Sequence, residues 1–369
     1  MALLNKVKPS KNIGPGEHIQ ELMELRDWTQ QDLSDVLGVS TKHVNKLLKN
    51  EQSLTLNMAK LLGEAFKLSP EFWINLDTRY RLRLEEENEE DKDVDLRSKI
   101  YHYMPINEMA RKGWINKPDS TDELEELVCD FWKTKSIDFN LMSQGANLNF
   151  RKSEAYEGFN KFAANCWYQM AKNKASEKKV PEYNKMKLTN FANELHSYTN
   201  AKKGAIEAIK SLNEAGVKFL ILSHLQRTYI DGASFIANGS PVIVYTARYK
   251  RNDNFWFTFA HEIAHVLKHL KKEGDYVLDE IKKEESKSKK EQEADDFASD
   301  VLRHNEILAF FDNDLTYITQ EQIEECSKEL DVDTGIIMGA LAYHKQISYK
   351  YLHIFTHDIT EKIPAEYFI

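Results

Sequence analysis

Residues 255–267 read FWFTFAHEIAHVL, an apolar stretch that contains two histidines and a glutamate. Its composition predicts a buried helix. Residues four apart share a helix face, so the imidazoles of His261 and His265 can bind one ion at about 2.0–2.1 Å. Glu262 is placed to take a proton from an attacking water. The pattern is the minimal layout of a zinc-dependent hydrolase, and we therefore expect a Zn site on this helix.

A catalytic zinc has three protein ligands and one open position, so a third donor is expected further along the chain. Residues 291–302 read EQEADDFASDVL and predict a second helix with an apolar side. Glu293 borders that side and lies far enough from His265 for a loop and a helix to pack back. We predict Glu293 as the third ligand, with Glu291 in reserve.

Two alternatives to this ligand set are weaker. His269 lies two helical turns from His261 and does not easily reach the same ion. The metzincin pattern is not met, since Lys268 stands where its glycine belongs and Lys271 where its third histidine belongs. Zinc is therefore expected to rest on histidine and glutamate side chains.

The sequence does not decide which residue stabilises the oxyanion or which one orients a ligand imidazole. Tyr245, Tyr276 and His304 are nominations for the group that stabilises the oxyanion, although core packing, loop exposure and a helix-end position are the favoured explanations for them. Asp296 is a candidate for orienting a ligand imidazole. An ordinary surface carboxylate explains Asp296 equally well.

Bulk composition bounds the class of protein. With 369 residues and 41% hydrophobic residues, the chain is long enough for two or three globular domains. No apolar run approaches a membrane span and no signal peptide begins the sequence, so we expect a cytoplasmic protein that does not contact a membrane. Three widely separated cysteines favour reduced core thiols over disulfides. The formal net charge of −9 confines any DNA contact to a local surface.

The N-terminal part has the pattern of a helix-turn-helix. Thr29 is placed to cap a helix over 30–37, Gly38 suits the left-handed turn at its end, and Ser40 or Thr41 begins the next helix over 41–49. Apolar residues of the two helices are expected in the core, Val36 among them. In such a motif the second helix enters the major groove of DNA, and the start of the first lies near phosphate.

Four segments extend this interpretation to a family. They are GEH at 16–18, TQQDL at 29–33, LGVS at 37–40 and SPEFWINL at 69–76, and together they resemble the HigA-type antitoxin branch of the Xre/Cro helix-turn-helix family. The resemblance implies a five-helix domain that binds double-stranded operator DNA, usually as a homodimer. Carried over by position, the residues at the DNA are Gln30, Thr41, Lys42 and Lys46, with Ser40 on the backbone.

The chain beyond residue 83 changes character several times. An acidic run at 85–91 predicts a linker, and residues 96–198 predict helices without a catalytic spacing. Strands are expected at 217–222, 234–237 and 241–245, the last two joined by an Asn238-Gly239 turn in a small antiparallel sheet. A charged stretch at 282–290 predicts a solvated loop, and residues 323–341 predict a further helix pair.

The sheet, FTFAHEIAH at 257–265 and EADDFA at 293–298 together resemble the ImmA/IrrE family of metallopeptidases. The resemblance implies zinc on His261, His265 and Glu293 with Glu262 as general base. Members of that family cleave a repressor or release a regulatory partner. The resemblance therefore also implies a protein partner, either a toxin or a repressor substrate.

The sequence thus predicts a mainly helical α+β protein in three parts. Residues 1–83 form the helix-turn-helix domain, 84–198 an acidic linker and helical middle region, and 199–369 a zincin-like domain with the sheet, the HExxH helix and C-terminal helices. Three functions are compatible with it: a regulator whose zinc endopeptidase cleaves a protein, a catalytically silent antitoxin-like repressor that binds a partner or senses a signal, and a scaffold in which metal only joins helices.

Overall fold

The computed structural model describes residues 12–85, 89–143, 158–200, 204–280, 288–311 and 318–369. It divides into two compact units, Met1–Leu96 and Arg97–Ile369. Helices after residue 97 thus belong to the same unit as the sheet, and the three-part division at residues 83 and 198 stays a prediction. Residues 86–88 of the acidic run at 85–91 and residues 282–287 of the charged stretch at 282–290 lie outside the described residues.

The first unit contains the predicted five-helix domain. Its helices are α1 (Pro15–Glu24), α2 (Gln30–Leu37), α3 (Thr41–Leu48), α4 (Leu56–Phe66) and α5 (Pro70–Glu85), and α6 (Glu89–Tyr103) follows. The Thr29 hydroxyl accepts a hydrogen bond from the Asp32 amide at the start of α2, and Gly38 ends α2 in the left-handed region at φ 65°. Ser40 then caps α3 by accepting from the His43 amide. These local signals produce the tight turn between α2 and α3.

The core of the first unit is formed by the inward faces of these helices. Leu33 and Leu37 of α2 and Val44 of α3 are buried, while Val36 is 50% exposed. The expectation that Val36 lies in the core was wrong, because the inward stripe of α2 follows positions 33, 34 and 37. A Cβ on Gly16 would lie 2.2 Å from the Leu48 carbonyl, so α1 approaches the end of α3 closely.

The second unit combines helices with one sheet. Its helices are α7 (Ile106–Arg111), α8 (Thr121–Trp132), α9 (Phe139–Ser143), α10 (Lys161–Glu177), α11 (Lys185–Asn193), α12 (Leu195–Asn200), α13 (Gly204–Glu214), α14 (Asn252–Lys268), α15 (Lys289–Val301), α16 (His304–Phe311), α17 (Gln320–Leu330) and α18 (Thr334–Tyr343), and short 3₁₀ turns follow. The mainly helical α+β fold predicted from the sequence is confirmed. No helix in the described part of the chain is both long and apolar enough to cross a membrane.

The sheet is mixed rather than purely antiparallel. Its strands are β1 (Lys218–Ile221), β2 (Ile230–Ala237), β3 (Ser240–Tyr245) and β4 (Tyr276–Glu280), in the order β1-β3-β2-β4. The predicted hairpin of β2 and β3 turns at Asn238 and Gly239, both with positive φ, but β1 pairs with β3 in parallel. The sequence did not predict β4, which pairs with β2 and forms an edge.

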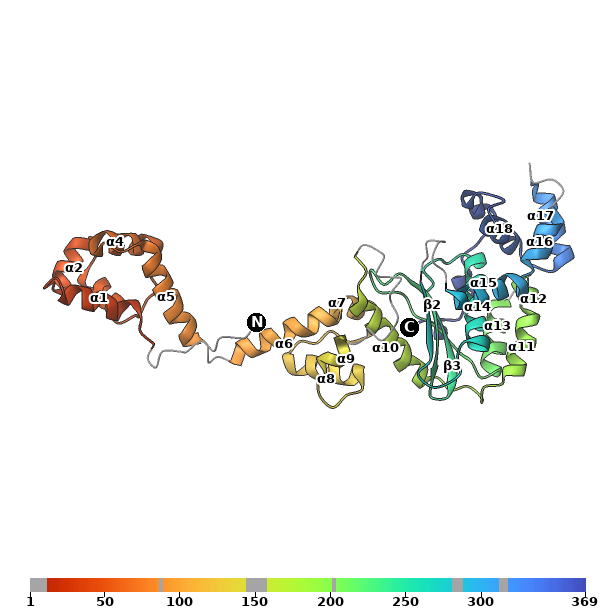
Figure 1. Ribbon diagram of the computed structural model, residues 1–369, viewed down its shortest axis with the longest axis horizontal. Helices are drawn as coiled ribbons and strands as arrows, with labels where there is room; N and C mark the ends of the chain where they lie inside the picture. The colour runs from red at the N-terminus through yellow and green to blue at the C-terminus, as the bar shows by residue number, and fades with distance from the viewer. Residues whose placement is uncertain (1–11, 86–88, 144–157, 201–203, 281–287, 312–317) are drawn as a thin grey trace. The chain divides into compact units, whose positions relative to one another are not determined.

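Side-chain alternation gives the sheet two different faces, one toward α14 and one toward α10 (Figure 1). Phe219 of β1 contacts Phe259 of α14, with ring centroids 5.5 Å apart. On the other face, Phe235 of β2 contacts Tyr168 of α10 at 5.1 Å. The helix with the HExxH pattern therefore lies along one buried face of the sheet.

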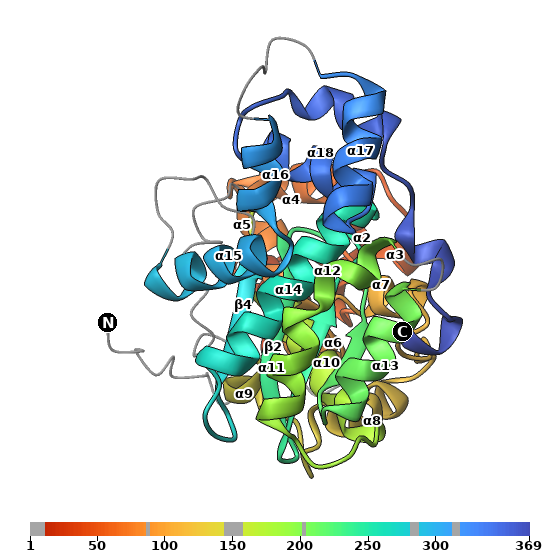
Figure 2. The ribbon, with the colours of Figure 1, turned by 90° about the vertical axis from the view of Figure 1, so that its right-hand side faces the viewer.

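Helix α14 is held in place by packing against α18 and by hydrogen bonds at its first turn. Helices α16, α17 and α18 gather at the top of the view in Figure 2, and α18 packs on α14. The Asn252 amide donates to the Asp333 carboxylate at 2.6 Å and its oxygen accepts from the His357 amide at 3.2 Å. The first turn of α14 is thus tied to the start of α18 and to the C-terminal segment, which limits how the helix can rotate.

Candidate metal centre and helix-turn-helix surface

Three buried side chains meet between α14 and α15. The Nε2 atoms of His261 and His265 lie 2.9 Å apart, as their spacing of one helical turn predicts. The Glu291 carboxylate lies 3.9 Å from His261 Nε2 and 3.7 Å from His265 Nε2. Exposure of these three residues is 3%, 0% and 6%. They form the one group of three or more potential metal donors found among the described residues.

The spacing of these donors fits a zinc ion. Tetrahedral bonds of 2.0–2.1 Å place two ligand atoms about 3.3 Å apart, and the three observed separations lie on both sides of that value. Two imidazoles and one carboxylate are also a donor set that zinc accepts. Three protein donors leave the fourth position of a tetrahedron for another group, as in catalytic rather than structural sites.

Glu291 occupies the third position and Glu293 lies outside the donor group. The reason is helical periodicity: Glu291 and Asp295 are four residues apart and both face α14, whereas a residue two positions from Glu291 points to a different side. Glu291 is 6% exposed, while the Glu293 side chain is 41% exposed. The geometry thus favours the reserve candidate of the sequence analysis.

Asp295 orients the first histidine. Its carboxylate lies 2.9 Å from His261 Nδ1, which directs Nε2 of the same ring toward Glu291. Asp296, the sequence-based candidate for this role, accepts from Gln292 at 2.8 Å on the exposed side of α15. The signal that could have identified Asp295 is the i, i+4 spacing from Glu291, which puts donor and anchor on one face.

The second histidine is held through a longer chain of contacts. His265 Nδ1 lies 2.8 Å from Nδ1 of His269, and His269 Nε2 lies 3.1 Å from a carboxylate oxygen of Glu293. The hydrogen bond from His269 lowers the pKa of Glu293. His269 and Glu293, both considered as ligands from the sequence, thus lie behind His265 rather than beside the ion.

Glu262 lies outside the donor group and against strand β2. The Ser234 hydroxyl donates a short hydrogen bond to the Glu262 carboxylate, and a Cβ on Gly232 would lie 2.4 Å from the same carboxylate. Glu262 is 1% exposed. Sequence reasoning missed Ser234 and Gly232, since only the packing of α14 on β2 brings them to Glu262.

The three nominations for an oxyanion group lie in different places. Tyr276 opposes Phe235 in the sheet and contacts Tyr168 at 5.8 Å, so it lies on the α10 face, away from α14. The Tyr245 hydroxyl donates to the Tyr249 carbonyl. His304 stacks on Phe257 with ring centroids 5.8 Å apart. His304, the one of the three whose side chain is a potential metal donor, is not part of the donor group.

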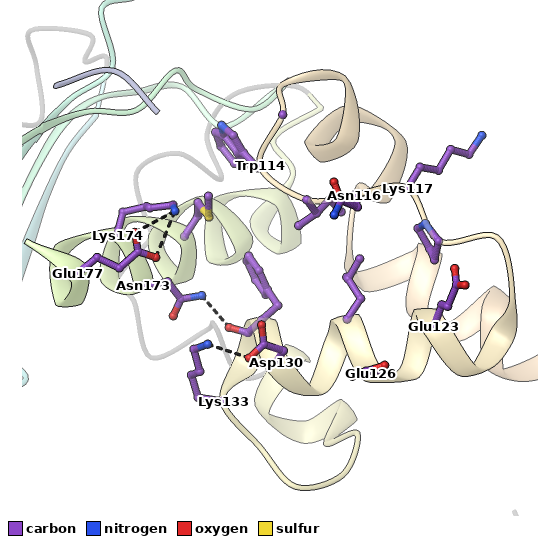
Figure 3. Close-up of a pocket in the computed structure, with 16 residues that line it drawn as sticks. Trp114, Asn116, Lys117, Glu123, Glu126, Asp130, Lys133, Asn173, Lys174 and Glu177 are labelled. Carbon is purple, nitrogen blue, oxygen red and sulfur yellow. Dashed lines mark hydrogen bonds and ion pairs between the residues drawn. The ribbon is translucent and has the colours of Figure 1, made fainter. Parts of the chain in front are cut away.

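A separate cavity of about 610 Å³ lies between residues 113–118, α8 and α10 (Figure 3). Lys174 pairs with Glu177 at 3.0 Å and Lys133 with Asp130 at 2.9 Å. Asn173 donates to the Phe131 carbonyl at 2.8 Å. Four of the charged side chains that line the cavity are thus paired with each other. None of the site residues predicted from the sequence lines this cavity.

The predicted DNA-contacting residues lie on the surface of the first unit. Their side chains are exposed, and they occupy the starts of α2 and α3 and the outer side of α3: Gln30, Ser40, Thr41, Lys42 and Lys46. Ser40 is also the cap of α3. Gln52 lies 2.8 Å from His43 Nε2 and so ties the middle of α3 to the next loop. The structure thus presents an exposed helix with two lysines.

Comparison with known proteins defines the class of each part. Residues 19–73 match the helix-turn-helix family, and residues 213–355 match the IrrE N-terminal-like domain family. The chain therefore carries an Xre-type helix-turn-helix domain at its N-terminus and an IrrE/ImmA-like domain in its C-terminal half.

A curated relative supports the first assignment. An uncharacterized HTH-type transcriptional regulator of Haemophilus influenzae is 37% identical over 68 residues, which are 18% of this chain and 64% of the relative. The chain thus spans just under two thirds of the length of that relative.

Proposed function

We propose that this protein is a DNA-binding transcriptional regulator whose IrrE-like domain is a zinc-dependent endopeptidase acting on a protein partner. The observation that carries the proposal is the buried donor group of His261, His265 and Glu291 with Glu262 beside it on α14. The helix-turn-helix domain and its regulator-like relative support the DNA-binding part. The partner proposed as substrate is a repressor protein.

DNA binding is assigned to the exposed side of α3. Lys42 and Lys46 supply local positive charge in a chain whose formal net charge is −9, and such contacts make affinity depend on salt. Two copies of the domain would bind the halves of a two-fold operator, so the active form is proposed to be a homodimer.

Lys46→Ala tests the DNA-binding surface. It should weaken operator binding and reduce the salt dependence of the affinity. Lys60→Ala removes the same charge from the exposed side of α4 and serves as the matched control. Gel-shift titrations at two salt concentrations measure both effects. Equal affinity of the two variants would contradict the assigned orientation.

In the peptidase, His261, His265 and Glu291 would hold the zinc ion. When held there, zinc would supply the Lewis acid that polarises the carbonyl of the scissile bond. Glu262 takes the proton of the attacking water and later delivers it to the leaving amine. Ser234 holds the Glu262 carboxylate through its hydroxyl hydrogen bond, which fixes the position from which the proton is accepted.

Zinc content of the purified full-length protein tests the metal site. Wild type should hold one zinc per chain, and Glu291→Gln should lose it. Glu293→Gln is the matched control, since the same change two residues away leaves the donor group intact. Wild type without stoichiometric zinc, or loss of zinc in Glu293→Gln alone, would overturn the assignment.

A second candidate is a catalytically silent HigA-type antitoxin that represses its operon and binds a toxin through the peptidase-like domain. The donors and Glu262 are all at most 6% exposed. A peptidase needs its substrate to reach these groups, so their burial favours the silent antitoxin. Glu262→Gln separates the two candidates: a peptidase loses cleavage of its partner, whereas a silent antitoxin keeps both repression and toxin neutralisation. In the scaffold alternative, metal removal melts the second unit and no partner is cut.

A further inference from the structure

We infer that His269 and Glu293 are positioning residues of the metal centre, which hold the His265 ring so that its Nε2 faces the ion. The inference rests on the proposed zinc site. It assigns Glu293 a role behind a ligand instead of as one. His269 Nε2 lies 3.1 Å from the Glu293 carboxylate, and the Nδ1 atoms of His269 and His265 lie 2.8 Å apart.

The proton positions in this chain follow from the donor and acceptor rules. An ionised carboxylate only accepts, so His269 must carry its proton on Nε2. A neutral His269 then has an acceptor at Nδ1, and His265 must donate from its own Nδ1. The lone pair of a neutral His265 is therefore on Nε2, the atom that faces His261 and Glu291. One assignment of protons satisfies both contacts and leaves His265 in the tautomer that binds metal.

The chain is built into the packing of the two helices. The His269 side chain is 5% exposed, so its ring cannot turn freely, while Glu293 reaches the surface at 41% exposure. Lys289 lies 3.7 Å from the Glu293 carboxylate, and Lys268 of α14 donates to the Glu293 carbonyl at 3.3 Å. These contacts keep Glu293 beside His269.

Helix α15 thereby contributes three acidic residues, each two positions from the next, and each has a different role at the site. Glu291 is a donor, Asp295 anchors His261 directly, and Glu293 anchors His265 through His269. Because all three come from one helix, docking of α15 on α14 fixes the orientation of both histidines in the same step. A change that disturbs the longer chain should affect one ligand ring and leave the other in place.

The test compares zinc affinity, by competition with a chelator, and the visible spectrum of the cobalt-substituted full-length protein. His269→Phe should weaken zinc binding by about 10–100-fold, the usual effect of losing such a partner. Glu293→Ala should weaken it in the same direction, while Glu293→Gln keeps an acceptor for His269 and should stay near wild type. Asp296→Ala, on the exposed side of α15, is the control.

The outcomes separate this inference from the proposed zinc site. Wild-type protein that binds no stoichiometric zinc overturns both. Wild type that binds zinc, together with Glu293→Ala of unchanged affinity and unchanged cobalt spectrum, overturns the positioning chain alone. Loss of stoichiometric zinc in Glu293→Gln would also overturn it, since that result marks a ligand. Glu293→Ala serves beside His269→Phe because the Glu293 side chain is 41% exposed, so its truncation leaves the core intact.

Discussion

Acid should destabilise the second unit through His304 at the start of α16. This side chain is 3% exposed and stacks on Phe257, and its ring lies 5.6 Å from that of His344. Burial, with a smaller contribution from His344, lowers the pKa of His304 from 6.5 to about 3. Because the folded state holds the ring neutral while the unfolded chain takes up a proton below pH 6.5, lowering the pH favours the unfolded state.

The expected size follows from the two pKa values. Between pH 7 and pH 5 the His304 ring stays neutral in the folded state. In the unfolded chain the ring takes up a proton, mainly over the roughly 1.5 pH units below its pKa of 6.5. This difference lowers the free energy of unfolding by about 2 kcal/mol. His304→Phe keeps a ring against Phe257 and removes the titration. The His304 Nδ1 atom has no hydrogen-bond partner among the described residues, so an apolar ring sacrifices little there.

Urea unfolding of the full-length chain at both pH values, followed by tryptophan fluorescence, measures the effect. Between pH 7 and pH 5, the free energy of unfolding of the second unit should fall by about 2 kcal/mol less in His304→Phe than in wild type. Tyr343→Phe, which alters another ring beside His304, is the matched control and should keep the wild-type slope. The reasoning is refuted if His304→Phe and wild type lose equal stability.

Two further predictions concern the contacts that hold the functional groups. Gly232→Ala places a Cβ 2.4 Å from the Glu262 carboxylate, so it should cost about 1–3 kcal/mol in urea unfolding and displace that carboxylate while zinc stays bound. An unchanged unfolding midpoint would show that β2 has more room than the structure gives it. Ser40→Ala removes the cap of α3 and should destabilise the first unit by about 1 kcal/mol. Retention of full thermal stability would argue against that hydrogen bond.

Much of the fold follows from local sequence signals. A cap at Thr29, a left-handed Gly38 and a cap at Ser40 or Thr41 predicted the turn between α2 and α3, and the structure has the caps at Thr29 and Ser40 and the left-handed Gly38. The Asn238-Gly239 turn likewise predicted the hairpin of β2 and β3. These features depend on residues a few positions apart, so they can be inferred without knowing the rest of the chain.

The pairing of strands is less accessible from the sequence. Strand β1 lies beside β3 although β2 follows it in the chain, and β4 joins the far edge of β2. Pairing of this kind depends on which surfaces the helices cover. The face on which Tyr276 lies was therefore decided by the register of β4 against β2, which no local pattern reveals.

The candidate metal centre likewise combines features that follow from local sequence with features that depend on packing. The sequence by itself determined that His261 and His265 share a face, because a helical turn of 3.6 residues brings positions four apart together. For the third donor it favoured Glu293 and kept Glu291 in reserve, although the choice depends on how the helix is turned and either residue could lie on the inward side of a free helix. Only the rotation of α15 against α14 decided it: Glu291 faces the histidines, and Glu293 meets His269. That rotation is set by the burial of the apolar side of α15 on α14, a long-range contact that spacing along the chain does not encode.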